Sequence, residues 1–168
     1  MKKITIFTML TVGLMFLMGI DTEAATLKGT CVKVSQGDTI FVRVARRILE
    51  IRLAGVDCPE EGQDFFTESK EFTAARALKK RVTVEVSSFE GERQIIGRVA
   101  VGEMDLSLPL VEKGLAWYYK ETGADKALAK AQKRAKKNKL GLWSQPNPVA
   151  PWIYRKIKDT PQQPQSHP

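Results

Sequence analysis

The sequence is poor in the side chains that bind soft metals. Its 168 residues include two cysteines, Cys31 and Cys58, and one histidine, His167. Two thiols cannot form a tetrahedral zinc site alone, and His167 lies in a terminal segment rich in proline and glutamine. These side chains therefore do not indicate a zinc centre of cysteine and histidine ligands. A single Cys31–Cys58 disulfide stays open, and no internal repeat is visible.

The sequence also has fewer acidic than basic residues. Aspartate and glutamate number 19, lysine and arginine number 27, and the formal net charge is +8 with a pI near 9.6. So basic a small domain favours an acidic partner, such as nucleic acid or a polyanionic surface. Solubility alone is the other explanation of the charge.

A long apolar run stands at the N-terminus. Lys2 and Lys3 precede an uncharged stretch over residues 4–20, and the small residue Ala24 follows. This pattern is typical of a secretory signal peptide that ends at Ala24. An uncleaved membrane anchor is the alternative, because the run is close to the shortest helix that spans a bilayer. We expect an exported protein, periplasmic or secreted, with a signal peptide at 1–24, a folded domain at 25–155 and a disordered Pro/Gln-rich tail at 156–168.

The order of the elements indicates a small barrel. Alternating apolar residues predict strands, and helical spacing with capping residues predicts helices. Strands are expected within residues 26–44 around a turn at 36–38, and at 48–56, 82–86 and 95–101; helices are expected at 65–80, at 107–113 with Ser107 as N-cap, and at 124–138. Three strands, a helix, two strands and further helices suit the OB-fold. The predicted class is α+β, a five-stranded OB-fold β-barrel with about three helices.

Residues 51–60 (Ile-Arg-Leu-Ala-Gly-Val-Asp-Cys-Pro-Glu) are the centre of the functional prediction. Arg52 lies on a strand, and Asp57 and Glu60 stand on the loop at its end, where Pro59 breaks the strand pattern. A cation close to two carboxylates suits a site that holds a hard metal ion and a phosphate together. A strand-end salt bridge of Arg52 is the alternative that these residues alone leave open.

Several short motifs resemble the staphylococcal nuclease (thermonuclease) family in order and spacing. They are Gly37-Asp38-Thr39, residues 52–60, Gly97-Arg98 and Gly114-Leu115-Ala116-Trp117, and Gly141-Leu142-Trp143 with residues 146–152 resembles the C-terminal end of exported bacterial members. The resemblance covers about residues 26–155. It implies an OB-fold barrel with three helices and a calcium-dependent phosphodiesterase acting on DNA and RNA.

The resemblance also assigns the cation and phosphate sites by position. It makes Asp38 and Asp57 the calcium ligands, together with the backbone carbonyl of Cys58. It makes Arg52 and Arg98 the groups that bind the scissile phosphate. Calcium accepts six to eight oxygen ligands in loose geometry, which this set and water can supply. Two guanidiniums suit a phosphodiester whose oxygens gain negative charge during attack.

The resemblance further makes Glu60 the candidate general base. Tyr119, or else Tyr118, is expected to form the aromatic wall of the nucleotide site, and capping of the barrel is the alternative role of both. The family commonly has Asp-Lys/Arg-Tyr before its Gly-Arg. This chain has residues 94–96 (Gln-Ile-Ile) there, a departure where the family contacts the nucleotide.

An OB-fold module that binds nucleic acid with weak or lost catalysis is the alternative function. Relatives of that kind lack one or more of the key positions, whereas all five side chains are present here: Asp38, Arg52, Asp57, Glu60 and Arg98. A basic surface-binding protein would explain the charge but not these five. We expect a monomer with calcium as cofactor, DNA and RNA as substrates and no stable protein partner. Membrane contact is expected only if the N-terminal segment stays uncleaved.

Overall fold

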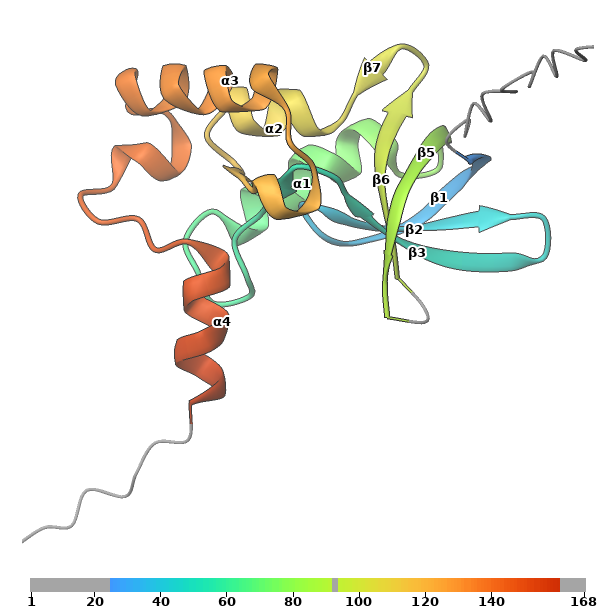
Figure 1. The fold of residues 1–168 in the computed structure, drawn as a ribbon, viewed down its shortest axis with the longest axis horizontal. Helices are drawn as coiled ribbons and strands as arrows, with labels where there is room; N and C mark the ends of the chain where they lie inside the picture. The colour runs from blue at the N-terminus through green and yellow to red at the C-terminus, as the bar shows by residue number, and fades with distance from the viewer. Residues whose placement is uncertain (1–24, 92–93, 161–168) are drawn as a thin grey trace, which may run out of the picture.

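The computed structural model describes residues 25–91 and 94–160 (Figure 1). The strands are β1 Thr26–Gln36, β2 Thr39–Val44, β3 Arg47–Leu53, β4 Val56–Asp57, β5 Arg81–Glu90, β6 Gln94–Val101, β7 Met104–Asp105 and β8 Trp117–Tyr118. The helices are α1 Phe66–Ala77, α2 Ser107–Glu112, α3 Lys126–Lys137 and α4 Pro151–Asp159, with short 3-10 turns at Lys120–Thr122 and Gly141–Ser144. The predicted signal peptide and residues 161–168 of the predicted tail lie outside the described residues.

Five strands close into a barrel. β1 pairs antiparallel with β2 and β5, β2 pairs with β3, and β5 pairs with β6. A parallel pairing of β3 with β6, from Glu50 opposite Gln94 to Leu53 opposite Gly97, closes the ring. Strands β4 and β8 form a separate two-stranded sheet. The predicted α+β class with an OB-type five-stranded barrel is confirmed.

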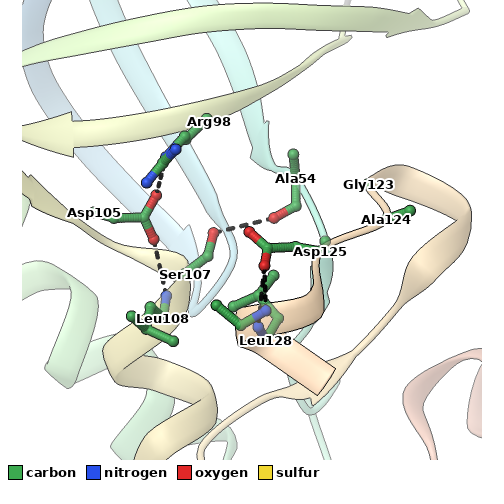
Figure 2. Close-up of a pocket in the computed structure, with 11 residues that line it drawn as sticks. Ala54, Arg98, Asp105, Ser107, Leu108, Gly123, Ala124, Asp125 and Leu128 are labelled. Atoms are coloured by element: carbon green, nitrogen blue, oxygen red, sulfur yellow. Dashed lines mark hydrogen bonds and ion pairs between the residues drawn. The ribbon is translucent and has the colours of Figure 1, made fainter. Parts of the chain in front are cut away.

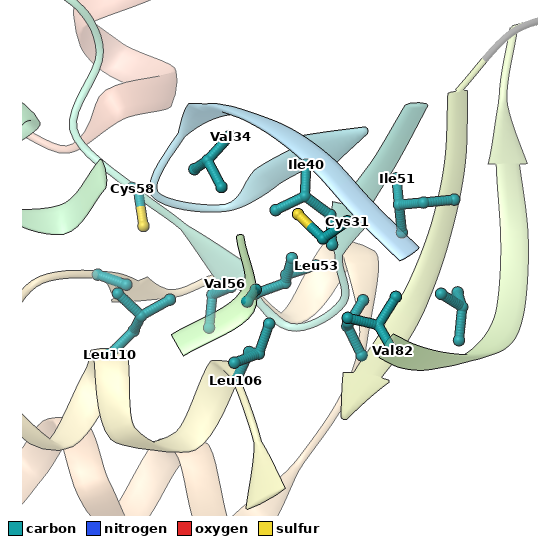
Figure 3. Packing of buried hydrophobic residues seen from close by; sticks show 14 of the residues in the cluster. Cys31, Val34, Ile40, Ile51, Leu53, Val56, Cys58, Val82, Leu106 and Leu110 are labelled. Carbon is teal, nitrogen blue, oxygen red and sulfur yellow. The ribbon is translucent and has the colours of Figure 1, made fainter. Parts of the chain in front are cut away.

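The barrel core forms because apolar residues alternate along its strands. Ile40 on β2 and Ile51 and Leu53 on β3 are fully buried, and Leu110 of α2 packs into the same cluster (Figure 3). Burying a side chain of this size contributes about 1.5–3 kcal/mol. Successive side chains of a strand point to opposite faces, so the inward Ile51 and Leu53 direct Arg52 away from the core. The core alternation therefore positions the first functional side chain.

Both cysteines belong to this core. Cys31 and Cys58 are buried, and both thiols are free. Burial raises the pKa of each thiol above its ordinary value, and for Cys58 the neighbouring Asp38 adds to the effect. The disulfide that the sequence left open is therefore not formed in this structure.

The start of α2 corrects one capping prediction. Ser107 is the first residue of α2, and its hydroxyl donates to the carbonyl oxygen of Ala54 at 3.1 Å. The carboxylate of Asp105 accepts the Leu108 N–H at 2.9 Å instead. Ser107 is buried beside the β3–β4 turn, so its hydroxyl meets a backbone acceptor of that turn rather than the free N–H groups of its own helix.

A fourth helix, α4, was not predicted (Figure 1). Pro151 occupies its first turn, where a missing N–H is tolerated, and Lys156 and Lys158 lie in its last turn. The helix continues to Asp159, so the tail boundary predicted at residue 156 falls inside it. The composition that indicated disorder begins only at Pro161. Within residues 25–91 and 94–160, no helix has the length and apolar character needed to cross a bilayer.

Candidate active site

Two buried carboxylates form the floor of the candidate site. Asp38 directly precedes β2, Asp57 ends β4, and their exposed fractions are 3% and 1%. Asp38 Oδ2 accepts the N–H of Cys58 at 2.9 Å, and Asp38 Oδ1 accepts the hydroxyl of Thr39 at 3.1 Å. The bond to Cys58, the residue after Asp57, fixes the turn before β2 against the end of β4.

The turn that carries Asp38 depends on a close approach of two chain segments. A Cβ added to Gly37 would lie 2.7 Å from Cys58 Sγ and 2.7 Å from Ser69 Cβ. Real Cβ atoms do not approach other atoms so closely, and both neighbours are buried. The hydroxyl of Thr73 on α1 donates to the Gly37 carbonyl oxygen. Glycine is therefore required here, and α1 holds the turn in place.

Burial makes the ionised form of Asp38, in the floor of the site, unfavourable. The pKa of Asp38 is raised to about 6, first because the carboxylate is desolvated and then because the charge of Asp57 is close. The hydrogen bond from Cys58 and the charge of Arg52 act in the opposite direction without cancelling this effect. A site that holds two carboxylates against their preference for water is suited to a cation.

Arg52 extends from β3 over these carboxylates. Its Nη2 donates to Asp57 Oδ1 at 3.1 Å and its Nη1 to Glu90 Oε2 at 3.1 Å, and its side chain is 13% exposed. Burial alone would lower the pKa of Arg52, but Asp38 and Asp57 outweigh burial and raise it. The guanidinium is therefore a permanent cation held in place by the fold.

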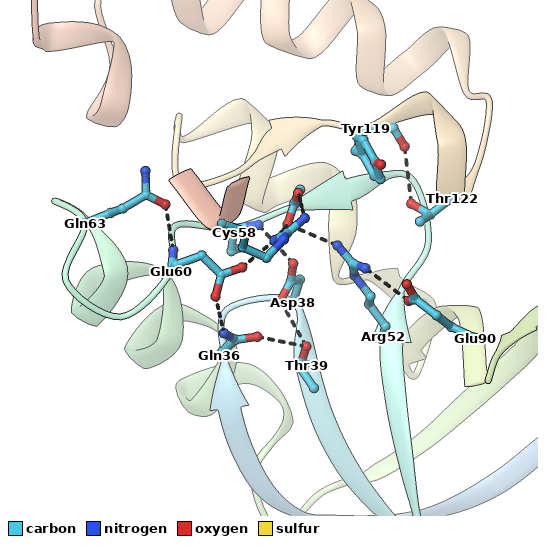
Figure 4. Close-up of polar contacts among 12 residues, drawn as sticks. Gln36, Asp38, Thr39, Arg52, Cys58, Glu60, Gln63, Glu90, Tyr119 and Thr122 are labelled. Atoms are coloured by element: carbon cyan, nitrogen blue, oxygen red, sulfur yellow. Dashed lines mark hydrogen bonds and ion pairs between the residues drawn. The ribbon is translucent and has the colours of Figure 1, made fainter. Parts of the chain in front are cut away.

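Glu60 stands across the site from Arg52. Figure 4 shows the two side chains pointing toward Asp38 from opposite sides. Glu60 Oε2 accepts the side-chain amide of Gln36 at 2.8 Å, and the Glu60 backbone N–H donates to Gln63 Oε1 at 2.9 Å. Its exposed fraction is 19%. The carboxylate is thus oriented by its neighbours and still open to water.

Arg155 completes the site and was missed by the sequence reasoning. Its Nη2 donates to Asp57 Oδ2 at 2.9 Å, and its Nη1 donates to Asp57 Oδ1 at 3.1 Å and to Glu60 Oε1. The pKa of Arg155 is raised, mainly by the hydrogen bond to Asp57. No strand pattern marks this residue, and nothing singles it out from the neighbouring Lys156 and Lys158. Its only signal is its place three residues after Trp152, the end of the C-terminal stretch that resembles family members.

These side chains enclose a cavity of about 280 Å³. Four carboxylates and two guanidiniums line it, so its formal charge is −2. Within the described part of the chain, no three Asp, Glu, His or Cys side chains converge as a metal cage. A cation here would therefore take two carboxylates and complete its shell with carbonyl and water oxygens, which calcium accepts. The lining residues are Gln36, Asp38, Thr39, Arg52, Asp57, Glu60, Glu90, Gln94 and Arg155.

The structure does not bring Arg98 to this cavity. Arg98 lies on β6, is 62% exposed, and donates its Nε to Asp105 Oδ2 at 2.7 Å (Figure 2). This hydrogen bond raises the pKa of Arg98. Arg98 lines a second hollow of about 170 Å³ with Ser107 and Asp125 among its neighbours. The sequence therefore predicted four side chains that converge and one that lies outside the cavity.

The predicted aromatic wall is also outside the lining of the acidic cavity. Tyr119 stacks on Trp152 with ring centroids 5.0 Å apart, and the Arg52 guanidinium lies 5.9 Å from the Tyr119 ring centroid. The backbone N–H of Tyr118 donates to Gln132 Oε1 at 2.9 Å. Tyr119 is thus a supporting neighbour of Arg52, while Tyr118 faces the α3 side.

Comparisons with known proteins show which proteins this chain resembles. Residues 50–145 match the model of a family described as staphylococcal nuclease homologue. An uncharacterized endonuclease of Escherichia coli is 34% identical over 145 residues, 86% of this chain and 95% of that protein. A micrococcal nuclease of Shigella flexneri is 32% identical over 143 residues, 79% of this chain and 82% of that protein. A probable staphylococcal-like nuclease of rice is 29% identical over 140 residues, 82% of this chain and 28% of that protein.

Proposed function

The chain belongs to the staphylococcal nuclease family, as its motifs predicted, and we propose that it is a calcium-dependent phosphodiesterase that hydrolyses DNA and RNA. Its nuclease relatives support a hydrolase that acts on nucleic acid. One observation carries the proposal: the buried carboxylates Asp38 and Asp57 share a cavity with Arg52 and Glu60. Each of these side chains has a separate task in phosphodiester hydrolysis.

Asp38, Asp57 and the carbonyl of Cys58 are the groups that would hold calcium. The donors fit a hard cation because they are oxygens and because the cavity carries a formal charge of −2. When bound, calcium supplies positive charge to the phosphate and lowers the pKa of water beside it. The raised pKa of Asp38 supports this assignment, since a buried carboxylate without enough positive charge is unfavourable.

Glu60 is the group proposed to take the proton. Its carboxylate accepts a proton from the attacking water while the water oxygen forms a bond to phosphorus and the bond to the leaving oxygen breaks. The leaving oxygen then takes a proton from solvent water. Gln36 and Gln63 hold Glu60 at the edge of the cavity, where water has access. A positioned general base of this kind contributes about 10²- to 10⁴-fold to a rate.

Arg52 and Arg98 are proposed to stabilise the charge that develops on the phosphate. A guanidinium forms two parallel hydrogen bonds to phosphate oxygens, which strengthen as their charge grows. Arg52 is held ready over the cavity by Asp57 and Glu90. Arg98 would exchange Asp105 for a phosphate, and breaking an exposed pair of this kind costs at most about 1 kcal/mol.

A nucleic-acid-binding protein with weak catalysis is the second candidate. Two observations favour it: Arg155 occupies the carboxylate of Asp57, and residues 94–96 depart from the family pattern at the nucleotide contact. We also propose that the protein is exported, on the strength of the sequence of residues 1–24 alone.

A cleavage assay separates these functions. The purified protein is mixed with single-stranded DNA, duplex DNA and RNA, each with calcium and with excess chelator. Glu60→Gln should lower the calcium-dependent rate about 10²- to 10³-fold, and Arg98→Ala should also lower it. The matched control Glu61→Gln removes a neighbouring exposed carboxylate and should leave the rate unchanged. Cleavage in chelator, or an unaffected Glu60→Gln, contradicts the mechanism, and tight salt-sensitive binding without cleavage indicates the second candidate.

A further inference from the structure

Arg155 joins the two carboxylates that the proposed mechanism assigns to different tasks. It reaches across 98 residues of sequence to donate two hydrogen bonds to Asp57, and it donates a third to Glu60. Asp57 is 1% exposed, and both of its oxygens accept from Arg155. The contact is therefore a forked bridge between the buried Asp57 and an arginine whose side chain is 36% exposed.

The helix that carries Arg155 is anchored separately from this bridge. Trp152 stacks on Tyr119 at 5.0 Å and meets Trp117 edge to face at 5.5 Å. The side-chain amide of Gln63 donates to the carbonyl oxygen of Val149 at 2.9 Å, just before the helix begins. Three aromatic rings thus pack helix α4 against the site. They hold the backbone of Arg155 in place independently of its ion pairs.

The bridge also changes the charge that a cation would meet. The lining of the cavity has a formal charge of −2 with Arg155 and −3 without it. Arg155 also donates to both oxygens of Asp57, the carboxylate that a cation would use. Removing its guanidinium therefore frees a ligand and adds one negative charge to the site. Both changes favour a divalent cation.

We propose that Arg155 is a positioning residue that holds Glu60 against Asp57 and competes with the divalent cation for Asp57. The inference rests on the proposed function for the tasks of the two carboxylates, but its cation arm can be tested without nuclease activity. Loss of Arg155 leaves Glu60 with Gln36 as its side-chain partner, so the carboxylate is less well oriented. The cation should therefore bind more tightly while the reaction becomes slower.

The opposite effects on cation affinity and on reaction rate distinguish a positioning role from a purely structural one. A residue that merely anchors the C-terminal helix would, when replaced, loosen the site and weaken cation binding and catalysis together. For Arg155→Met we expect the calcium dissociation constant to fall about tenfold, as for one added charge at close range. We expect kcat to fall about 10- to 100-fold with little change in KM, as for other residues that orient a catalytic group.

The experiment uses the full chain, stripped of metal with a chelator. Calcium is titrated calorimetrically into the wild type, Arg155→Met, Arg155→Lys and the matched control Lys156→Met, and kcat and KM are measured on single-stranded DNA. Lys156 is exposed on the same helix, so its replacement removes the same charge outside the site. Lysine at position 155 keeps the charge but not the fork, so Arg155→Lys should lie between the wild type and Arg155→Met.

Each outcome decides between the proposals. Tighter calcium binding with slower cleavage in Arg155→Met, absent in Lys156→Met, supports the inference. Unchanged or weaker calcium binding overturns it, even if the wild type is an active nuclease. Tighter binding in a protein that cleaves nothing would support the competition of Arg155 with the cation, overturn its effect on the reaction and reject the nuclease itself. If Arg155→Met does not fold, Arg155→Lys decides. Tighter calcium binding than in the wild type supports the inference, and unchanged or weaker binding overturns it.

Discussion

The two arginines assigned to the phosphate lie in very different surroundings. Arg52 is 13% exposed and is bound by two carboxylates, one of them the buried Asp57. Arg98 is 62% exposed and is bound by one, Asp105, in a separate hollow (Figure 2). The fold therefore fixes Arg52 over the acidic cavity, whereas Arg98 lies outside that cavity and is bound only to Asp105.

This difference separates stability from activity. An arginine that neutralises a buried carboxylate is part of the folded structure, because its loss leaves a charge without enough partners. An arginine in an exposed pair adds little to stability and can serve the reaction alone. The following substitutions test that separation from the larger expected effect to the smaller.

Replacing Arg52 should have the largest effect, on stability and rate together. Arg52→Ala removes one of the two guanidiniums on Asp57 and should lower the free energy of unfolding by about 2–4 kcal/mol. The cleavage rate should fall by about 10³-fold or more, since a preorganised charge is lost. Urea denaturation and kcat/KM measure the two effects. Arg52→Lys should restore part of the stability but little of the rate. An unchanged free energy of unfolding in Arg52→Ala would mean that Arg52 contributes no more to stability than an exposed arginine does.

Asp38→Asn tests how much stability the protein loses by burying the ionised carboxylate of Asp38. The folded pKa of Asp38 is about 6, and that of an unfolded aspartate is about 3.9, so burying the charged form costs about 3 kcal/mol. The folded state holds this proton more tightly, so the wild type loses stability as pH rises from about 4 to about 6. In chelator, Asp38→Asn should therefore be more stable by about 2–3 kcal/mol at pH 7.5 and nearly equal at pH 4.

Urea denaturation between pH 4 and 7.5 measures this effect, with the exposed Asp159→Asn as control. Calcium provides the second arm, because a ligand that binds only the folded state stabilises it. Saturating calcium should raise the stability of the wild type and leave Asp38→Asn almost unchanged. A gain for Asp38→Asn that persists at pH 4 would contradict the assignment of the cost to the buried charge.

Replacing Arg98 should have the smallest effect on stability. Arg98→Ala should change the free energy of unfolding by less than about 0.5 kcal/mol while lowering the cleavage rate by about 10²-fold. Asp105→Asn is the matched variant, because its amide oxygen can still accept the Leu108 N–H while the ion pair is lost. It should leave the rate unchanged or slightly higher, since Arg98 is freed. A loss of stability in Arg98→Ala equal to that of Arg52→Ala would make the two arginines equivalent.

Local patterns predicted much of the fold and the centre of the site. Alternation along residues 48–56 predicted a strand, and Ile51 and Leu53 on it are buried. The spacing from Arg52 to Asp57 and Glu60 placed three charged groups at one strand end. These predictions succeed because each depends on residues a few positions apart. The parallel pairing of β3 with β6 was not predicted, since no local rule registers strands across 44 residues.

The missed features share a long-range origin. Ser107 has the side chain of an N-cap, but its hydroxyl meets the Ala54 carbonyl, a contact that depends on how the barrel folds. Arg155 follows an aromatic and proline-rich stretch that is typical of the end of a folded domain. The stacking of Trp152 on Tyr119 nevertheless places Arg155 at the site. Arg98 was grouped with Arg52 by motif, and only the structure shows that Arg52 is largely buried while Arg98 is largely exposed.

The parallel pairing of β3 with β6 also determines when the barrel can close during synthesis of the chain. A chain is made from its N-terminus, and strands that pair across long stretches of sequence assemble slowly. The barrel cannot close until β6 has been made, and Asp57 receives its second guanidinium only when residue 155 follows. The cavity therefore lacks part of its lining in a nascent chain until residue 155 has been made.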